Sequence, residues 1–79
     1  MWYVYIIQCN DSTLYTGITN DVENRISRHE SGKGAKYTRG RGPFVLKYVE
    51  QVENRSQALK REYVIKQLSR KNKMMLWKN

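Results

Sequence analysis

The sequence has few of the residues that build covalent cross-links, metal clusters or membrane spans. Its 79 residues include one cysteine, Cys9, one proline and one histidine. A lone cysteine can form neither an intrachain disulfide nor a cysteine-based zinc site, which fits a reducing setting. No apolar run reaches the roughly 18 residues that a membrane span needs, and Met1 leads directly into a predicted strand instead of a signal peptide. We therefore expect a cytoplasmic protein with no membrane segment and no disulfide partner.

Acidic residues are also scarce. Fifteen lysines and arginines against seven aspartates and glutamates give a formal net charge of +8. Such a charge on a short chain favours polyanionic partners through steering and counterion release, although it can also serve solubility alone. Six tyrosines, two tryptophans and one phenylalanine favour nucleic acid among these partners, because aromatic rings stack on bases. The length predicts a single domain, residues 1–79, with a modest core.

Two segments near the start, residues 2–9 and 13–19, predict a β-hairpin. Both are rich in aromatic and β-branched residues, and the Asn-Asp-Ser triplet between them favours a turn. Because side chains alternate along strands, a turn centred on this triplet places Tyr5 and Tyr15 on the same face. Gly17 then stands opposite Tyr5 and leaves room beside a ring. A shift of one residue would separate the two tyrosines.

A helix is predicted to follow the hairpin. Asn20 can cap its first turn, Glu23 can complete a capping box, and Gly32 can end the helix. Spacings of three and four residues place Arg25 and His29 on the same stripe as apolar side chains, facing the sheet. A cation turned inward needs a partner or a function.

The stretch from Ser31 to Pro43 is rich in glycine and basic residues and is predicted to be a loop. It is either a solvated connector or a nucleic-acid contact, since glycine lets backbone N–H groups approach a phosphate that lysine and arginine neutralise. Its aromatic residue could stack on a base or simply cover the loop. The candidate nucleic-acid-binding residues are Lys33, Lys36, Tyr37, Thr38, Arg39 and Arg41.

The remaining chain predicts one more strand and two helices. Alternating side chains over residues 44–52 indicate the third strand of an antiparallel three-stranded sheet flanked by helices. Ser56 is a suitable N-cap for a second helix that ends near Leu68, and Ser69 can cap a short third helix. The residues of the tail that we expect to pack back on the sheet are Met74, Met75, Leu76 and Trp77.

Glu62 lies near the middle of the apolar arc of the second predicted helix, between Ala58 and Leu59 on a helical projection. A carboxylate at that position indicates either a functional role or an ion pair across the core, most simply with Arg25. Helix geometry alone favours neither the functional role nor the ion pair.

In this order the residues resemble the GIY-YIG nuclease superfamily. The positions that carry the resemblance are Tyr3-Val4-Tyr5, Tyr15-Thr16-Gly17, Arg25, His29 and Glu62. The stretch from His29 to Pro43 is similar to the small UPF0213 (YhbQ-like) branch, and the resemblance covers nearly the whole chain. Tyr3 departs from the glycine that is frequent in the family, while the tyrosine of the motif is kept. The resemblance implies the GIY-YIG fold, an α/β (α+β) architecture in the order β-β-α-β-α-α.

The resemblance further implies an endonuclease that depends on a divalent metal and hydrolyses DNA phosphodiester bonds with structure selectivity or weak specificity. In this reading Glu62 holds one Mg²⁺ or Mn²⁺ and Arg25 gives a fixed charge to the phosphate. A tyrosine, Tyr5 or Tyr15, serves as base, and the sequence does not choose between them. His29 relays a proton or holds a tyrosine in place.

Two alternatives to an active nuclease stay open. A non-catalytic nucleic-acid-binding module would keep the fold and bind with a steep salt dependence whether or not Glu62 is intact. A scaffold for an acidic protein would show no preference for nucleic acid over other polyanions. The family often has a further asparagine after the glutamate, and only Asn72 and Asn79 are available for it.

Overall fold

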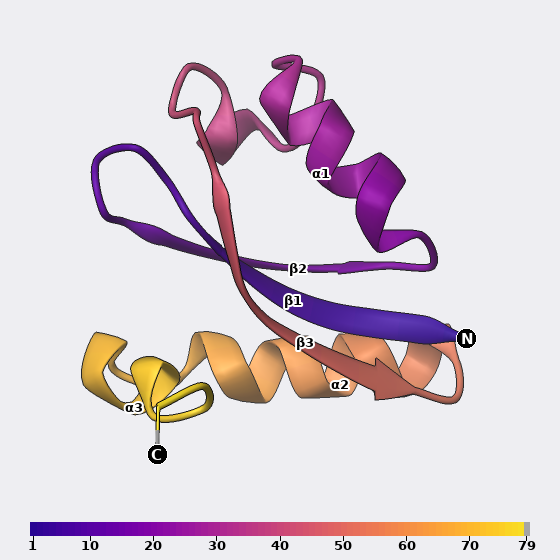
Figure 1. Cartoon of the computed structure of the whole chain (residues 1–79). Helices are drawn as coiled ribbons and strands as arrows, with labels where there is room; N and C mark the ends of the chain where they lie inside the picture. Colours follow the sequence, from indigo (N-terminus) through magenta and orange to yellow (C-terminus); the bar gives the residue numbers. More distant parts are fainter. Residues whose placement is uncertain (79) are drawn as a thin grey trace.

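The computed structural model describes residues 1–78 as a three-stranded antiparallel sheet with helices on both sides (Figure 1); Asn79 lies outside the described residues. The elements are β1 (Trp2–Gln8), β2 (Leu14–Thr19), α1 (Val22–Glu30), the 3₁₀ turn η1 (Lys36–Thr38), β3 (Val45–Val52), α2 (Arg55–Lys66) and α3 (Arg70–Met74). This order confirms the predicted α/β fold class. Among the described helices, none is long and apolar enough to cross a membrane.

The sheet has the order β2-β1-β3, so β1 is central and β2 is an edge strand. The register pairs Tyr5 with Gly17 and Ile7 with Tyr15, as the predicted hairpin requires. Both tyrosines therefore project from the same face, since residues directly opposite each other share a face.

The two faces of β1 pack against different helices and carry different kinds of side chain. Val4 and Ile6 face α2 and form the core with Ala58 and Ile65, all four fully buried. Burial of each larger aliphatic side chain contributes about 1.5–3 kcal/mol, so this contact holds α2 to the sheet. The alternate face of β1 carries Tyr5. Figure 1 shows α1 on this opposite side of the sheet from α2.

Two helix starts differ from the sequence prediction. The N-cap of α1 is Asp21, not Asn20, and the N-cap of α2 is Asn54, not Ser56. Both observed caps have extended backbone, and each side chain accepts a hydrogen bond from the backbone N–H three residues further on, at 3.1 and 2.9 Å. Helix α2 also ends two residues before the predicted Leu68. At both helix starts the observed cap lies one or two residues from the predicted one, and both residue types at each start are suitable N-caps.

The C-terminal tail follows the prediction only in part. Helix α3 begins after Ser69, as predicted, and Leu76 and Trp77 pack against the core. Met75 does not, because 61% of it is exposed. Leu59, expected on the apolar arc of α2, is 41% exposed, since α2 turns other residues to the sheet. Strand β3 begins one residue after the predicted start.

Candidate functional site

A chain of polar side chains is buried between the sheet and α1. Tyr5 and His29 are 0% and 1% exposed, and the tyrosine hydroxyl lies 2.8 Å from His29 Nε2. Arg25, one helical turn before His29, donates from Nε to the same hydroxyl at 3.3 Å. Three of the predicted site residues thus meet at one oxygen atom.

The hydrogen bonds fix the position of the histidine proton. Thr38 is buried, and its hydroxyl donates to the carbonyl of Ala35 at 2.9 Å, so it can only accept from His29 Nδ1, which lies 2.7 Å away. In neutral imidazole, Nδ1 then carries the hydrogen and Nε2 is the acceptor. The Tyr5 hydroxyl therefore donates to His29 Nε2 while it accepts from Arg25.

Burial determines the charge states in this chain. Burial raises the pKa of Tyr5 to about 12, against the opposing effect of the hydrogen bond from Arg25. Burial and the nearby Arg25 charge lower the pKa of His29. The hydrogen bond to Tyr5, and more weakly the Tyr15 hydroxyl, raise the pKa of Arg25. At neutral pH the phenol and the imidazole are neutral and the guanidinium is the single fixed charge among these three groups.

Tyr15 joins the same cluster from β2. Its ring centroid lies 5.3 Å from that of His29 and 6.4 Å from that of Tyr5. Gly17 makes this arrangement possible, since a Cβ there would lie 2.6 Å from the Tyr5 hydroxyl oxygen and 3.0 Å from the Tyr15 ring. Unlike Tyr5, Tyr15 is only half-buried. It is the phenol of the pair that a ligand can reach.

Glu62 approaches the cluster from the other side of the sheet. Its side chain is 18% exposed and pairs with Lys66 at 3.4 Å, so its described ion-pair partner is not Arg25. The Glu62 carboxylate is the least of the causes that raise the pKa of Tyr5, behind burial. Lys66 and Tyr15 line the same hollow. Glu62 is thus close to the cluster around the β2 edge, without a direct hydrogen bond to it among the described contacts.

The basic loop is more ordered than a plain connector, because it contains η1. Tyr37 stacks on Tyr15 with ring centroids 5.8 Å apart, and the Arg41 guanidinium lies 4.6 Å from the Tyr37 centroid. Arg41 also pairs with Asp11 in the hairpin turn. Tyr37 therefore packs against one face of Tyr15, and its two sequence interpretations, stacking on a base or covering the loop, stay predictions. The remaining basic candidates, which are exposed on the surface, are Lys33, Lys36 and Arg39.

Sequence reasoning missed several residues that hold the histidine. Thr38 was named only as a nucleic-acid contact, and its bond to His29 has no periodicity signal. Gly34 packs so closely on His29 that a Cβ there would overlap the ring. Its place in a Gly-x-Gly run was a weak signal for such an approach. Phe44 adds a ring 5.8 Å from the imidazole.

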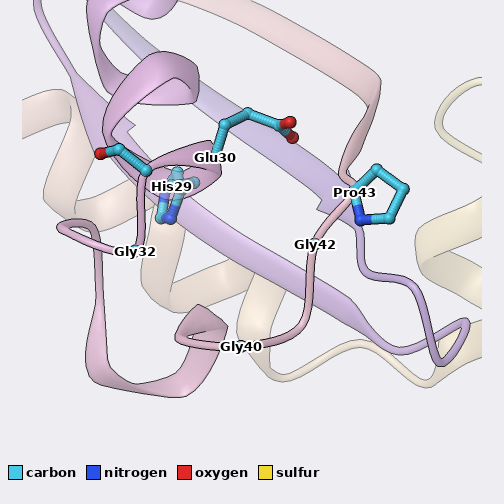
Figure 2. A pocket seen from close by; sticks show the side chains of 7 residues that line it. His29, Glu30, Gly32, Gly40, Gly42 and Pro43 are labelled. Atoms are coloured by element: carbon cyan, nitrogen blue, oxygen red, sulfur yellow. The ribbon is translucent and has the colours of Figure 1, made fainter.

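A second hollow, of about 420 Å³, reaches the cluster at His29 (Figure 2). It is bounded by the end of α1 and by the glycines and proline before β3. Glu30, at its rim in Figure 2, accepts a hydrogen bond from the Phe44 N–H at 2.8 Å. His29 of the cluster is one of its lining residues, whereas neither tyrosine of the cluster lines it.

Glu62 is the carboxylate that could hold a metal at this site. Within residues 1–78 no group of three or more His, Cys, Asp or Glu side chains is placed to share one ion. A partly exposed carboxylate still fits Mg²⁺, because this ion keeps several waters and binds through one or two carboxylates plus substrate phosphate.

Comparison with known proteins identifies the family. The profile described as the GIY-YIG catalytic domain matches residues 1–75. The chain belongs to the GIY-YIG family. A UPF0213 protein of Oceanobacillus iheyensis is 58% identical over 74 residues, covering 94% of this chain and 86% of that protein. Another, of Halobacterium salinarum, is 52% identical over 77 residues, covering 98% and 100%. Within the GIY-YIG family the chain is therefore one of the UPF0213 proteins.

Two solved structures share this GIY-YIG architecture. The solution structure of a UPF0213 protein from Bacillus halodurans is 52% identical and superposes with a TM-score of 0.60, covering 96% of this chain and 82% of that one. A protein of E. faecalis is 41% identical with a TM-score of 0.63, covering 92% and 78%. Family membership implies a nuclease-like function on nucleic acid, and GIY-YIG nucleases generally use a divalent metal.

Proposed function

We propose that this GIY-YIG chain is a single-domain endonuclease that hydrolyses DNA phosphodiester bonds with the help of one divalent metal ion, with structure selectivity or weak specificity. The proposal rests on one observation. Two phenols, a guanidinium and an imidazole lie together on one side of β2, and Lys66 and Glu62 lie close by across that edge.

The two tyrosines have different roles in this proposal. Tyr5 is fully buried, donates to His29 and has a pKa of about 12, so it is unsuited to take a proton from water. It positions Arg25 instead. Tyr15 is half-buried and lines the hollow that Lys66 also lines, which suits the general base.

Arg25 and His29 complete the protein's part in the reaction. With Nε bound to Tyr5, Arg25 keeps its terminal nitrogens for the phosphate, where a fixed guanidinium stabilises the charge that gathers on the oxygens during attack. His29 holds Tyr5, and through it Arg25, in place.

Glu62 would hold the metal ion, as the partly exposed carboxylate paired with Lys66, which lines this hollow. The bound Mg²⁺ or Mn²⁺ supplies Lewis-acid stabilisation of the phosphate and of the leaving oxygen. Lys66 must then exchange its ion pair with Glu62 for a substrate phosphate.

A cleavage assay tests the proposal. Purified protein is incubated with nicked, flapped and branched DNA, with Mg²⁺, with Mn²⁺ and with chelator. We expect metal-dependent cleavage, lost in Glu62→Ala and reduced at least about 100-fold in Arg25→Ala, the size of one electrostatic contact in a transition state. Glu53→Ala, which removes an exposed carboxylate just before α2, is the matched control and should cleave normally. Equal products from wild type and Glu62→Ala on every substrate would reject the proposal.

The second candidate function is a nucleic-acid-binding module without turnover. Two observations favour it: Glu62 is already paired with Lys66, and the described residues offer no multi-carboxylate metal cluster. The same assay separates the two, since such a module binds the substrates but yields no product with either metal.

A further inference from the structure

Beside Tyr15 the surface is hollowed into a groove between β2, η1 and α3. Two adjoining hollows, of about 340 and 220 Å³, share Leu14, Tyr37 and Lys73 as lining residues. Arg70 ties α3 to the hairpin, because its Nη1 donates to the carbonyl of Ser12 at 2.6 Å. The groove therefore has walls from three separate parts of the chain that are fixed to one another.

The lining chemistry combines cations with an apolar wall. Lys66, Lys73 and Arg70 line the two hollows, and no carboxylate does. Leu14 and the edge of the Tyr37 ring, which packs against Tyr15 and Arg41, provide an apolar wall against which a base can lie. Arg70 is bound to the hairpin carbonyl, so Lys73 is the cation best placed for a phosphate, and Lys66 can join it by leaving its ion pair with Glu62.

Thr16 supplies an independent sign of a ligand. This residue lines the larger hollow and is 3% exposed, yet its hydroxyl is the one buried side-chain oxygen of the described residues that lacks a hydrogen-bond partner. Leaving a buried hydroxyl unpaired costs about 1–3 kcal/mol, so such groups are rare without a reason.

We propose that the groove is a subsite for the unpaired nucleotide that flanks the cleaved phosphodiester. Its base lies against Leu14 and Tyr37, Lys66 and Lys73 bind its phosphate, and a phosphate oxygen gives Thr16 the acceptor that it lacks. The inference rests on the proposed function for the identity of the ligand. In this proposal the nucleic-acid strand runs toward α3 instead of along the glycine-rich loop, where the sequence predicts its contacts.

The size of the groove limits what it can hold. A hollow of about 340 Å³ is at the lower end of the ~300–1,000 Å³ that small-molecule sites span, which suits a single nucleotide and not a base pair. We therefore expect selectivity for substrates that have an unpaired nucleotide next to the cleavage position.

Titration of the ¹⁵N-labelled protein with short oligothymidine in chelator, where cleavage cannot occur, tests the subsite. The backbone signals of Leu14, Lys66 and Lys73 should shift, and those of Lys33 and Arg39 should shift less. Fluorescence anisotropy with the same oligonucleotide should show roughly tenfold weaker binding for Lys73→Gln, the size of one hydrogen bond to a charged group. The slope of log K against log salt should fall by about 0.7.

Lys71→Gln is the matched control, because it removes the same charge from α3 but lines a different hollow with Met74 and Met75. Equal losses for the two lysine variants, shifts confined to the loop, or equal competition by polyglutamate would each overturn the subsite. The outcome is independent of turnover. Cleavage with loop-only shifts rejects the subsite and keeps the nuclease. Groove shifts without cleavage keep the groove as a nucleotide-binding site and reject the nuclease.

Discussion

At the scale of single residues, the hydrogen bonds among the buried polar groups under α1 determine which group donates and which accepts. Arg25 donates to Tyr5, Tyr5 to His29, His29 to Thr38, and Thr38 to a backbone carbonyl. Each hydroxyl both donates and accepts, so the chain has one consistent direction. Removing any member leaves a buried donor or acceptor without a partner, which costs more than the net value of the bond itself.

Thr38→Val breaks this chain at its end while keeping the side-chain shape. His29 Nδ1–H loses its acceptor, so we expect a loss of about 1–3 kcal/mol in the free energy of unfolding and a mixture of histidine tautomers. Urea unfolding measures the first, and ¹⁵N shifts of the imidazole measure the second. Thr38→Ser keeps the acceptor and should retain the single tautomer. Identical ¹⁵N spectra for the valine and serine variants would contradict the assigned proton position.

His29 also makes stability depend on pH. Its pKa is lowered in the folded state by burial and by Arg25, so the unfolded chain binds a proton more readily. Stability is therefore full above the unfolded pKa of about 6.5 and falls as pH decreases below it, by at most about 1.4 kcal/mol per pH unit from this group. Urea midpoints between pH 5 and 8 check this. His29→Gln should show a flatter profile over that range, and an equal slope in both proteins would assign the effect to other groups.

At the scale of the elements, β2 brings Tyr15 to the site and Gly17 leaves space for it. Gly17→Ala would put a methyl group 2.6 Å from the Tyr5 hydroxyl, so one of the two rings must move. We expect a folded protein with at least about 100-fold lower cleavage, because small displacements of catalytic groups have such effects. Circular dichroism and aromatic NMR signals report the fold and the rings. In the control Gly42→Ala the new methyl lies no closer than 3.3 Å to Phe44, and similar losses in both variants would argue against a specific role for Gly17.

Element types and strand register were predictable from the sequence, whereas element ends and distant contacts were not. Alternation and the turn triplet determine the pairing of Tyr5 with Gly17, because a slip of one residue would expose the apolar face. The caps were misplaced by one or two residues, since Asn20 and Asp21 compete on equal local terms. The ion pair of Glu62 with Lys66 has the local i,i+4 spacing and could have been predicted, whereas the bond between His29 and Thr38 depends on packing, which local patterns do not encode.

At the scale of the whole molecule, the sheet separates a side with the aliphatic core from a side with the candidate site. The aliphatic core lies between β1 and α2, and the polar chain lies between β1 and α1. Edge strand β2 is the boundary where side chains of both sides, Tyr15 and Lys66, meet in one hollow. The aliphatic core holds α2 to the sheet, so substitutions on the α1 side leave this contact intact.

The net charge of +8 makes nucleic-acid binding a property of the whole molecule, and Glu62→Ala separates this binding from catalysis. Removing the carboxylate frees Lys66 from its ion pair and raises the net charge by one. We expect Glu62→Ala to bind flapped DNA in chelator at least as tightly as wild type, with a linear and steep fall of log K against log salt in both. Anisotropy over a series of salt concentrations measures this. Glu53→Ala adds the same charge away from the groove and should gain less affinity; weaker binding by Glu62→Ala would mean that the carboxylate holds the site together instead of serving a metal.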